Sequence, residues 1–263
     1  MNTQTANLEE TSAVTAVPGH PIVSPEAWLQ ARKTLLAKEK EFTRHRDELS
    51  RQRRELPWEA VEKEYVFEGP NGKESLADLF AGRSQLIVYH FMFGPDWPEG
   101  CPSCSLVADH FDGSLVHLAQ RDVTLVAASR ARREQIEAFQ KRMGWHFKWV
   151  SSNENDFNRD YHVSFTKEEM AQGAVPYNYG LHPFPSEEAP GVSVFTRDAR
   201  GGVFHTYSAY ARGVEELLRV YSYLDFTPKG RDEDSLPYPM AWVRHHDRYE
   251  ASASACCSRE EHA

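Results

Sequence analysis

Two cysteines, Cys101 and Cys104, are separated by a proline and a serine. This Cys-x-x-Cys spacing brings two sulfurs to bridging distance across one helical turn. Residues 85–93 before the pair are apolar, with β-branched and aromatic side chains, and predict a buried strand. Residues 105–111 behind it predict a helix up to Gly113. Cys101 is therefore expected at a helix N-terminus, where free backbone N–H groups and the helix dipole favour a thiolate.

A thiolate in that position has a defined chemistry. Free cysteine titrates near about 8.5, and cysteines at such sites fall to roughly 3.5–7.5. Cys101 would attack a disulfide sulfur to give a mixed disulfide, and the more buried Cys104 would then attack Cys101 and release the product. The alternatives are a zinc half-site and an inert pair. Zinc needs four ligands, and no second Cys-x-x-Cys or His pair follows at zinc-site spacing, so we expect no metal and no cofactor.

Three side chains near the pair could assist this chemistry. Trp97 could cover the dithiol and set its polarity, and Asp96 could accept the Cys104 proton. Arg130, which follows a predicted strand, could attract an anionic substrate or stabilise the thiolate. Each residue also has a structural explanation. Trp97 could cover the core, Asp96 could form a turn, and Arg130 could be a solvated surface arginine.

Two further cysteines, Cys256 and Cys257, are adjacent in a Ser/Ala-rich stretch near the end of the sequence. Adjacent cysteines are poorly placed to bridge each other. They belong either to a solvated tail without function or to a mobile third thiol that relays electrons to Cys101.

The composition limits the class of protein. The sequence has 263 residues, 40% of them hydrophobic and 12% aromatic, and a net charge of −9. This composition supports a real core and gives no reason to expect nucleic acid or an anionic membrane surface as a partner. No apolar run is long enough to span a bilayer, and residues 1–18 lack the basic and apolar regions of a secretory signal. We therefore expect a cytoplasmic protein whose partner is a protein or small-molecule thiol or disulfide.

The N-terminal part is expected to form a helical arm. Residues 1–20 show no sustained period and predict disorder, whereas residues 21–57 begin with Ser24 as N-cap before a proline and predict a helix to about Arg54. Apolar residues recur every seven positions on an otherwise charged rod: Trp28, Leu35, Phe42 and Leu49. Such a narrow seam must pack on its own domain or on a second copy, which makes a homodimer possible.

Residues 58–230 alternate predicted strands and helices, which indicates an α/β fold with a parallel component. A short helix is expected over 74–80, and a strand, a turn and a return strand over 192–207, followed by a closing helix over 213–223. Residues 151–189 are irregular and predict a lid or surface excursion before this hairpin. Residues 231–263 form a C-terminal extension and tail.

This order of elements resembles the thioredoxin-like fold, a central mixed sheet flanked by helices. More narrowly, the chain is similar to the bacterial DUF899 family of predicted dithiol-disulfide oxidoreductases over about residues 20–235. The resemblance rests on several stretches: residues 90–97, 100–105, 143–145, 149–152, 156–158, 193–195, 204–208 and 211–213.

The resemblance implies a dithiol-disulfide oxidoreductase, with antioxidant activity and with Cys101 as nucleophile and Cys104 as resolving thiol. It also implies that Pro190 holds a cis peptide facing the dithiol and aligns substrate. Gly100 stands where thioredoxin has a tryptophan, and residues 94–100 separate strand and dithiol as in the peroxide-reducing branch. A peroxiredoxin-like thiol peroxidase is therefore one alternative. A non-catalytic binding protein on the same fold is another.

Overall fold

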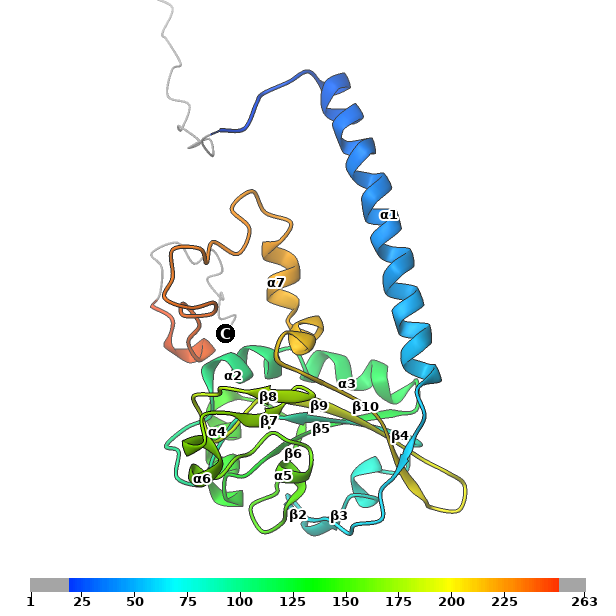
Figure 1. The fold of residues 1–263 in the computed structure, drawn as a ribbon, viewed down its shortest axis with the longest axis vertical. Helices are drawn as coiled ribbons and strands as arrows, with labels where there is room; N and C mark the ends of the chain where they lie inside the picture. Colours follow the sequence, from blue (N-terminus) through cyan, green and yellow to red (C-terminus); the bar gives the residue numbers. More distant parts are fainter. Residues whose placement is uncertain (1–18, 251–263) are drawn as a thin grey trace, which may run out of the picture.

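A mixed eight-stranded sheet forms the centre of the molecule in the computed structural model, which describes residues 19–250 (Figure 1). Its order is β1-β10-β9-β4-β5-β6-β2-β3. The strands are β1 (Glu59–Ala60), β2 (Val66–Gly69), β3 (Gly72–Ser75), β4 (Gln85–His90), β5 (Val123–Ser129), β6 (Lys148–Ser151), β9 (Gly191–Arg197) and β10 (Val203–Tyr210).

The middle of this sheet has the predicted thioredoxin-like arrangement. Strands β4, β5 and β6 run parallel, and the antiparallel hairpin β9–β10 continues the sheet on the other side of β4. Helix α2 (Pro102–Ala108) follows β4 after a loop and carries the dithiol. The predicted strand, Cys-x-x-Cys and helix are thus confirmed as elements in the expected order.

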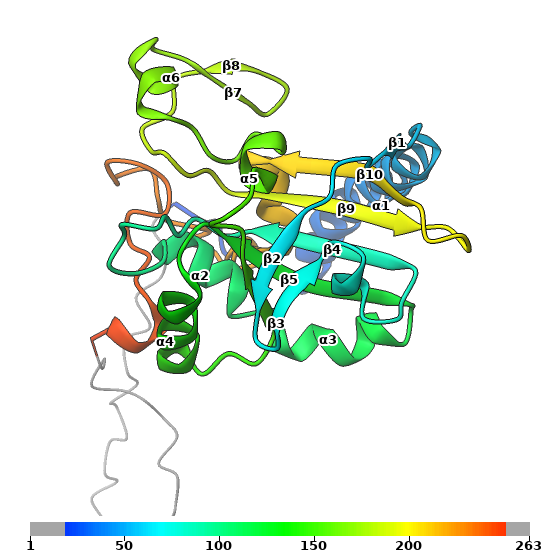
Figure 2. The same cartoon turned by 90° about the horizontal axis from the view of Figure 1, so that it is seen from below.

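Helices cover mainly one face of the sheet (Figures 1 and 2). The core on that face joins α2 to side chains of three further helices and of the aromatic strands β4 and β6. These helices are α3 (Asp112–Ala119), α4 (Arg133–Met143) and α7 (Arg219–Leu224). The opposite face is covered by a second core that includes residues of β2, the 3-10 turn η1 (Asp78–Phe80) and α5 (Phe157–Asp160). Alternate residues of β4 point to the two cores, as a pleated strand requires.

Three local expectations were wrong. Residues 74–80 form the end of β3 and η1 instead of one helix, because Ser75 pairs with Val66 in the β2–β3 hairpin. The closing helix is divided into η2 (Ala211–Leu217) and α7 by Leu218, whose backbone is not helical. Gly113 lies inside α3 and does not end a helix, since the break from α2 falls at residues 109–111.

The insertion forms a small unit of its own at one end of the sheet. It contains α6 (Lys167–Ala171), which begins with a Thr166–Glu169 capping box, and the two-stranded pair β7 (Val175–Tyr177) and β8 (Gly180–His182). Its side chains make a third buried cluster with Ala189 and Tyr210. The excursion is therefore anchored to the end of β10 next to the dithiol face.

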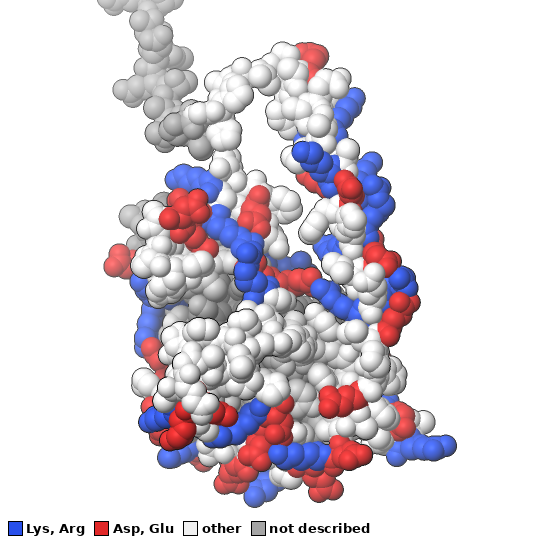
Figure 3. All heavy atoms as spheres, viewed as in Figure 1, with Lys and Arg blue, Asp and Glu red and all other residues white. Residues whose placement is uncertain are grey.

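Helix α1 (Pro25–Glu55) projects away from the sheet (Figures 1 and 3). It begins as predicted, with the Ser24 hydroxyl accepting from the Ala27 N–H, but none of its residues is buried. The seam residues Trp28 and Phe42 are 60% and 67% exposed. These exposures contradict packing of the seam on its own domain. The helix contacts the rest of the protein at its base, where Arg53 contacts Glu216 and the Tyr207 ring. Pairing with a second copy stays a prediction.

Removing residues 1–48 should leave the free energy of unfolding within about 0.5 kcal/mol of the intact chain, since no residue of α1 is buried. Arg53 is retained in this truncation. Thermal and urea unfolding followed by circular dichroism would measure the change. A loss of several kcal/mol would show that the helix has a stabilising contact in solution, and light scattering on both chains would show whether that contact is a dimer.

The C-terminal extension has little regular structure. Residues 226–250 are irregular apart from η3 (His246–Arg248) and lie over the end of the sheet near α2 (Figure 1). The predicted disorder of residues 1–18 and the roles considered for Cys256 and Cys257 fall outside the described residues. Within the described range, no helix is long and apolar enough to cross a membrane.

Candidate active site

Cys101 is the N-cap residue of α2, and Cys104 lies one turn further on. Both thiols are reduced, with Cys101 half-buried and Cys104 only 2% exposed. Pro102 occupies the first helical position, where a missing N–H leaves no hydrogen bond unmade. The structure therefore confirms the predicted relation of an accessible first cysteine to a buried second one.

The loop before Cys101 is held in place from several sides. The Cys101 N–H donates to the Met92 carbonyl at 3.0 Å, and the Ser105 N–H and hydroxyl both donate to the Cys101 carbonyl. Gly100 passes so close to the core that an added Cβ would lie 2.6 Å from a ring carbon of Phe91. No side chain fits there, which explains why glycine precedes the dithiol.

The two thiols have opposite electrostatic environments. Contact with the Cys104 thiol, helped by the backbone N–H groups of Cys104 and Ser103, lowers the pKa of Cys101 to about 7 against the effect of burial. Burial raises the pKa of Cys104 well above its usual range, and the neighbouring Cys101 raises it further. At neutral pH the negative charge therefore rests on Cys101, as nucleophilic attack by that sulfur requires.

Alkylation of Cys101 in the reduced protein should rise with pH through a midpoint near 7, because the thiolate is the reacting form. Cys104→Ala removes the largest cause of the lowered pKa and should move the midpoint up toward about 8.5. Cys104→Ser keeps a hydroxyl donor and should leave it closer to 7. Iodoacetamide kinetics with peptide mapping would measure these midpoints. A midpoint near about 8.5 in the reduced wild-type protein, as for a free cysteine, would contradict the assignment of the thiolate to Cys101.

A cavity of about 770 Å³ opens above the dithiol. Both cysteines, Ser103 and Pro190 line it, together with side chains from the insertion, η2, α7 and the C-terminal extension. Several lining residues were not anticipated from the sequence: Tyr89, Tyr177, Glu215, Tyr221, Arg231, Glu233 and Met240. A volume of this size is typical of small-molecule sites.

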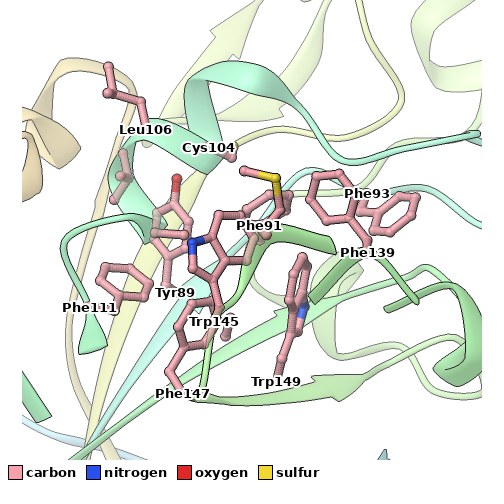
Figure 4. Packing of buried hydrophobic residues seen from close by; sticks show 14 of the residues in the cluster. Tyr89, Phe91, Phe93, Cys104, Leu106, Phe111, Phe139, Trp145, Phe147 and Trp149 are labelled. Atoms are coloured by element: carbon pink, nitrogen blue, oxygen red, sulfur yellow. The ribbon is translucent and has the colours of Figure 1, made fainter. Parts of the chain in front are cut away.

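Tyr89 is the residue that links the dithiol to the core. It is 1% exposed, its hydroxyl points toward α2 beneath Cys104 (Figure 4), and the two side chains interact. Burial first, and then Cys104, raise the pKa of Tyr89 well above its usual range, so the hydroxyl stays protonated. This position could have been inferred, because Tyr89 alternates with His90 on β4 and so faces the same side as the helices.

Pro190 lies in the predicted place but not in the predicted conformation. It lines the cavity with Cys101, and its carbonyl accepts from the Tyr177 hydroxyl at 2.7 Å. However, residues 19–250 contain no cis peptide bond, so the expectation of a cis Pro190 was wrong. The peptide bond before Pro190 has the trans form that most X–Pro bonds adopt. On either side of Pro190, the Ala189 N–H donates to the Val163 carbonyl and Gly191 begins β9.

The other predicted helpers do not line this cavity. Asp96 is exposed to solvent, and Trp97 packs against the core beyond the loop, with its carbonyl accepting from Gln135. Arg130 forms an ion pair with the buried Glu188 at 3.1 Å. Burial raises the pKa of Glu188 to about 7, while the Ser164 hydroxyl and Arg130 act in the opposite direction. The structure thus places none of these three side chains in the wall of this cavity.

The C-terminal extension is fastened directly to the dithiol loop. His245, which is 2% exposed, lies with its Nε2 2.8 Å from the Gly100 carbonyl oxygen. Glu99 accepts from Arg142 and Arg248, and Arg142 also donates to Asp247. These bonds hold residues 245–248 against the segment that leads into Cys101. Among the described residues, no group of three or more His, Cys, Asp or Glu side chains is placed to hold a metal ion.

Solved structures that resemble this chain share its fold only distantly. Xanthomonas campestris peroxiredoxin Q, as a C84S mutant, is 13% identical, with 65% of this chain and 97% of that chain covered and a TM-score of 0.44. Peroxidoxin BcpB from Mycobacterium tuberculosis is 13% identical, with 62% and 94% covered and a TM-score of 0.41. Curated proteins give no match.

A sequence family gives the decisive comparison. The family described as "Bacterial protein of unknown function (DUF899)" matches residues 17–249, which include the dithiol, the insertion and most of the C-terminal extension. This range covers far more than half of the 263 residues. The chain therefore belongs to the DUF899 family.

Proposed function

We propose that this protein is a thiol–disulfide oxidoreductase whose reacting groups are Cys101 and Cys104. The observation that carries the proposal is the placement of a half-buried thiol at the N-cap of α2 and of a buried thiol one turn further on, both lining one cavity. The lowered pKa of Cys101 and the raised pKa of Cys104 agree with this placement, since one sulfur can attack while the other stays protonated.

The reaction balances as two exchanges. The Cys101 thiolate attacks one sulfur of a substrate disulfide, forming a mixed disulfide and releasing the first thiolate. Cys104 then loses its proton and attacks the Cys101 sulfur, which releases the second thiolate and leaves a Cys101–Cys104 disulfide. The substrate gains two electrons, the dithiol loses two, and the protons of the two cysteines neutralise the two products. A second thiol or dithiol would return the enzyme to its reduced form.

Tyr89 supports the second exchange. Its hydroxyl contacts the Cys104 side chain and lowers the pKa of that thiol against the dominant effect of burial. A donor at this position stabilises negative charge as it develops on Cys104. Pro190 would position substrate through the cavity wall that it shares with Cys101.

Thiol peroxidase activity is the competing possibility, in which peroxide oxidises Cys101 to a sulfenic acid that Cys104 resolves. Stopped-flow measurements can separate the two. The reduced protein is mixed with a disulfide or with hydrogen peroxide, and each rate constant is divided by that of a free cysteine peptide at equal thiolate fraction. The proposal predicts that the protein reacts with the disulfide faster than the reference peptide does. With hydrogen peroxide it should react at the same rate as the reference peptide. The reverse pattern would establish a peroxidase, and no gain with either would leave a binding protein.

A further inference from the structure

The C-terminal extension forms part of the cavity above the dithiol. Tyr238, Pro239 and Met240 line this cavity together with Cys101, although they are separated from it by more than one hundred residues. The insertion contributes Tyr177 and Phe184 to the same cavity. A disulfide that reacts with Cys101 in this cavity would therefore meet side chains of both segments.

Glu233 holds the extension in position. One oxygen of its carboxylate accepts from the Tyr221 hydroxyl of α7 at 2.7 Å, from the Met240 N–H at 3.0 Å and from the Trp242 indole N–H at 2.6 Å. A charged acceptor with three donors is a strong local link. The nearby Arg231 stacks on the Tyr221 ring at 4.0 Å. Together with the His245 contact to Gly100, these bonds hold the extension to the rest of the protein at two places, one at α7 and one at the loop before Cys101.

The cavity wall near the thiols is mostly apolar and aromatic, and its charges are matched within the protein. Arg231 is paired with Asp225 and Glu215, and Arg212 is paired with Glu215. Glu233 is occupied by its three donors. The remaining wall offers apolar and aromatic surface, for example Met92, Val107, Phe184, Val214, Leu218 and Met240. A ligand with a net charge would therefore compete with these internal partners for the charged lining side chains.

We propose that the substrate is a neutral small-molecule disulfide with apolar or aromatic groups, bound in the cavity that the extension helps to line beside Cys101. This inference rests on the proposed function and specifies its substrate class. A disulfide within a folded protein would have to reach Cys101 with its flanking backbone attached, in a cavity lined by residues of the insertion, η2, α7 and the extension. A small apolar disulfide instead replaces water against the wall and presents one sulfur to Cys101.

The test uses the full chain with Cys256→Ser and Cys257→Ser, so that the signal comes from the dithiol alone. The probes are 2,2′-dithiodipyridine, which is neutral and aromatic, oxidised glutathione, which is charged, and insulin. Each rate is divided by that of a free cysteine peptide with the same probe at equal thiolate fraction. We expect saturation and a gain of about 100-fold with the aromatic disulfide, and almost no gain with glutathione or insulin.

Two variants test the role of the wall. Met240→Trp fills part of the cavity and should raise the half-saturating concentration of dithiodipyridine about 10-fold, whereas Met170→Trp, in the separate cluster of the insertion, should not. Glu233→Ala frees the extension and should increase the relative rate with insulin. Iodoacetamide labelling of Cys101 checks that the thiolate is intact in each variant.

The outcomes separate the two claims. A relative rate with insulin or glutathione equal to that with dithiodipyridine, unaffected by Met240→Trp, would overturn the substrate class and leave the oxidoreductase assignment standing. If no probe converts the two thiols to a disulfide faster than it oxidises the reference peptide, the proposed function itself fails.

Discussion

The Cys101→Ser variant is expected to lose disulfide reduction by about 1,000-fold or more, because a serine hydroxyl is not ionised at neutral pH and cannot start the exchange. Cys104→Ser should behave differently. Its Cys101 still attacks substrate at a rate within about threefold of wild type, because a hydroxyl donor remains beside the sulfur. The reaction then stops at the mixed disulfide.

Intact-mass measurement of the Cys104→Ser protein distinguishes these steps. In a chain that also carries Cys256→Ser and Cys257→Ser, the expected product has half of the substrate on Cys101, at one equivalent per chain, and is released by added thiol. The matched control is Cys101→Ser, in which the same treatment should leave Cys104 unmodified because it is buried and its pKa is raised. Efficient labelling of Cys104 in that control would mean that the nucleophile and the resolving thiol have been assigned the wrong way round.

Acid is expected to destabilise the fold through His90. This side chain is fully buried in β4, with Nε2 2.8 Å from the Ser193 hydroxyl oxygen and Nδ1 without a partner among the described residues. Burial, and secondarily His205, lowers the pKa of His90 to about 3. In the unfolded chain a histidine titrates near about 6.5. Between about pH 6.5 and pH 3 the unfolded chain therefore binds a proton at His90 that the folded protein does not bind.

The sign follows from this difference. The contribution of neutral His90 is fully present above pH 6.5, and it is lost progressively as the pH falls from 6.5 toward 3. A shift of this size corresponds to about 4 to 5 kcal/mol in the free energy of unfolding, which is a large share of the stability of a typical domain. Between pH 7 and pH 4 the loss should already be about 3 kcal/mol.

Urea unfolding of His90→Gln at several pH values tests this expectation. The amide can still bond to Ser193 but cannot take up the proton, so the variant should lose less stability than wild type on going from pH 7 to pH 4. His117→Gln is the matched control, because His117 is exposed on α3. Parallel pH profiles for wild type and His90→Gln would show that some other group governs acid unfolding.

The local elements around the dithiol could be predicted from the sequence. An apolar β-branched run, a Cys-x-x-Cys pair and a following helix are short-range signals, and each depends on side chains within a few positions of each other. The relative burial of Cys101 and Cys104 follows from one turn of that helix. The capping box at Thr166 is a short-range signal of the same kind.

The cavity could not be predicted, because long-range contacts build it. Residues 231–249 have no helical or strand period, and their position depends on single bonds such as those of Glu233 and His245. Asp96 and Trp97 are close to Cys101 along the chain, yet the loop directs them elsewhere. The sequence showed the apolar seam on α1, but it did not show whether the rest of the protein would cover that seam.

Peptide mapping of the protein after reaction with one equivalent of disulfide tests the central claim most directly. The account predicts release of two equivalents of thiol and a Cys101–Cys104 disulfide within the same chain. A stable adduct on Cys101 with Cys104 still a free thiol, or a product that links either cysteine to another residue, would contradict it.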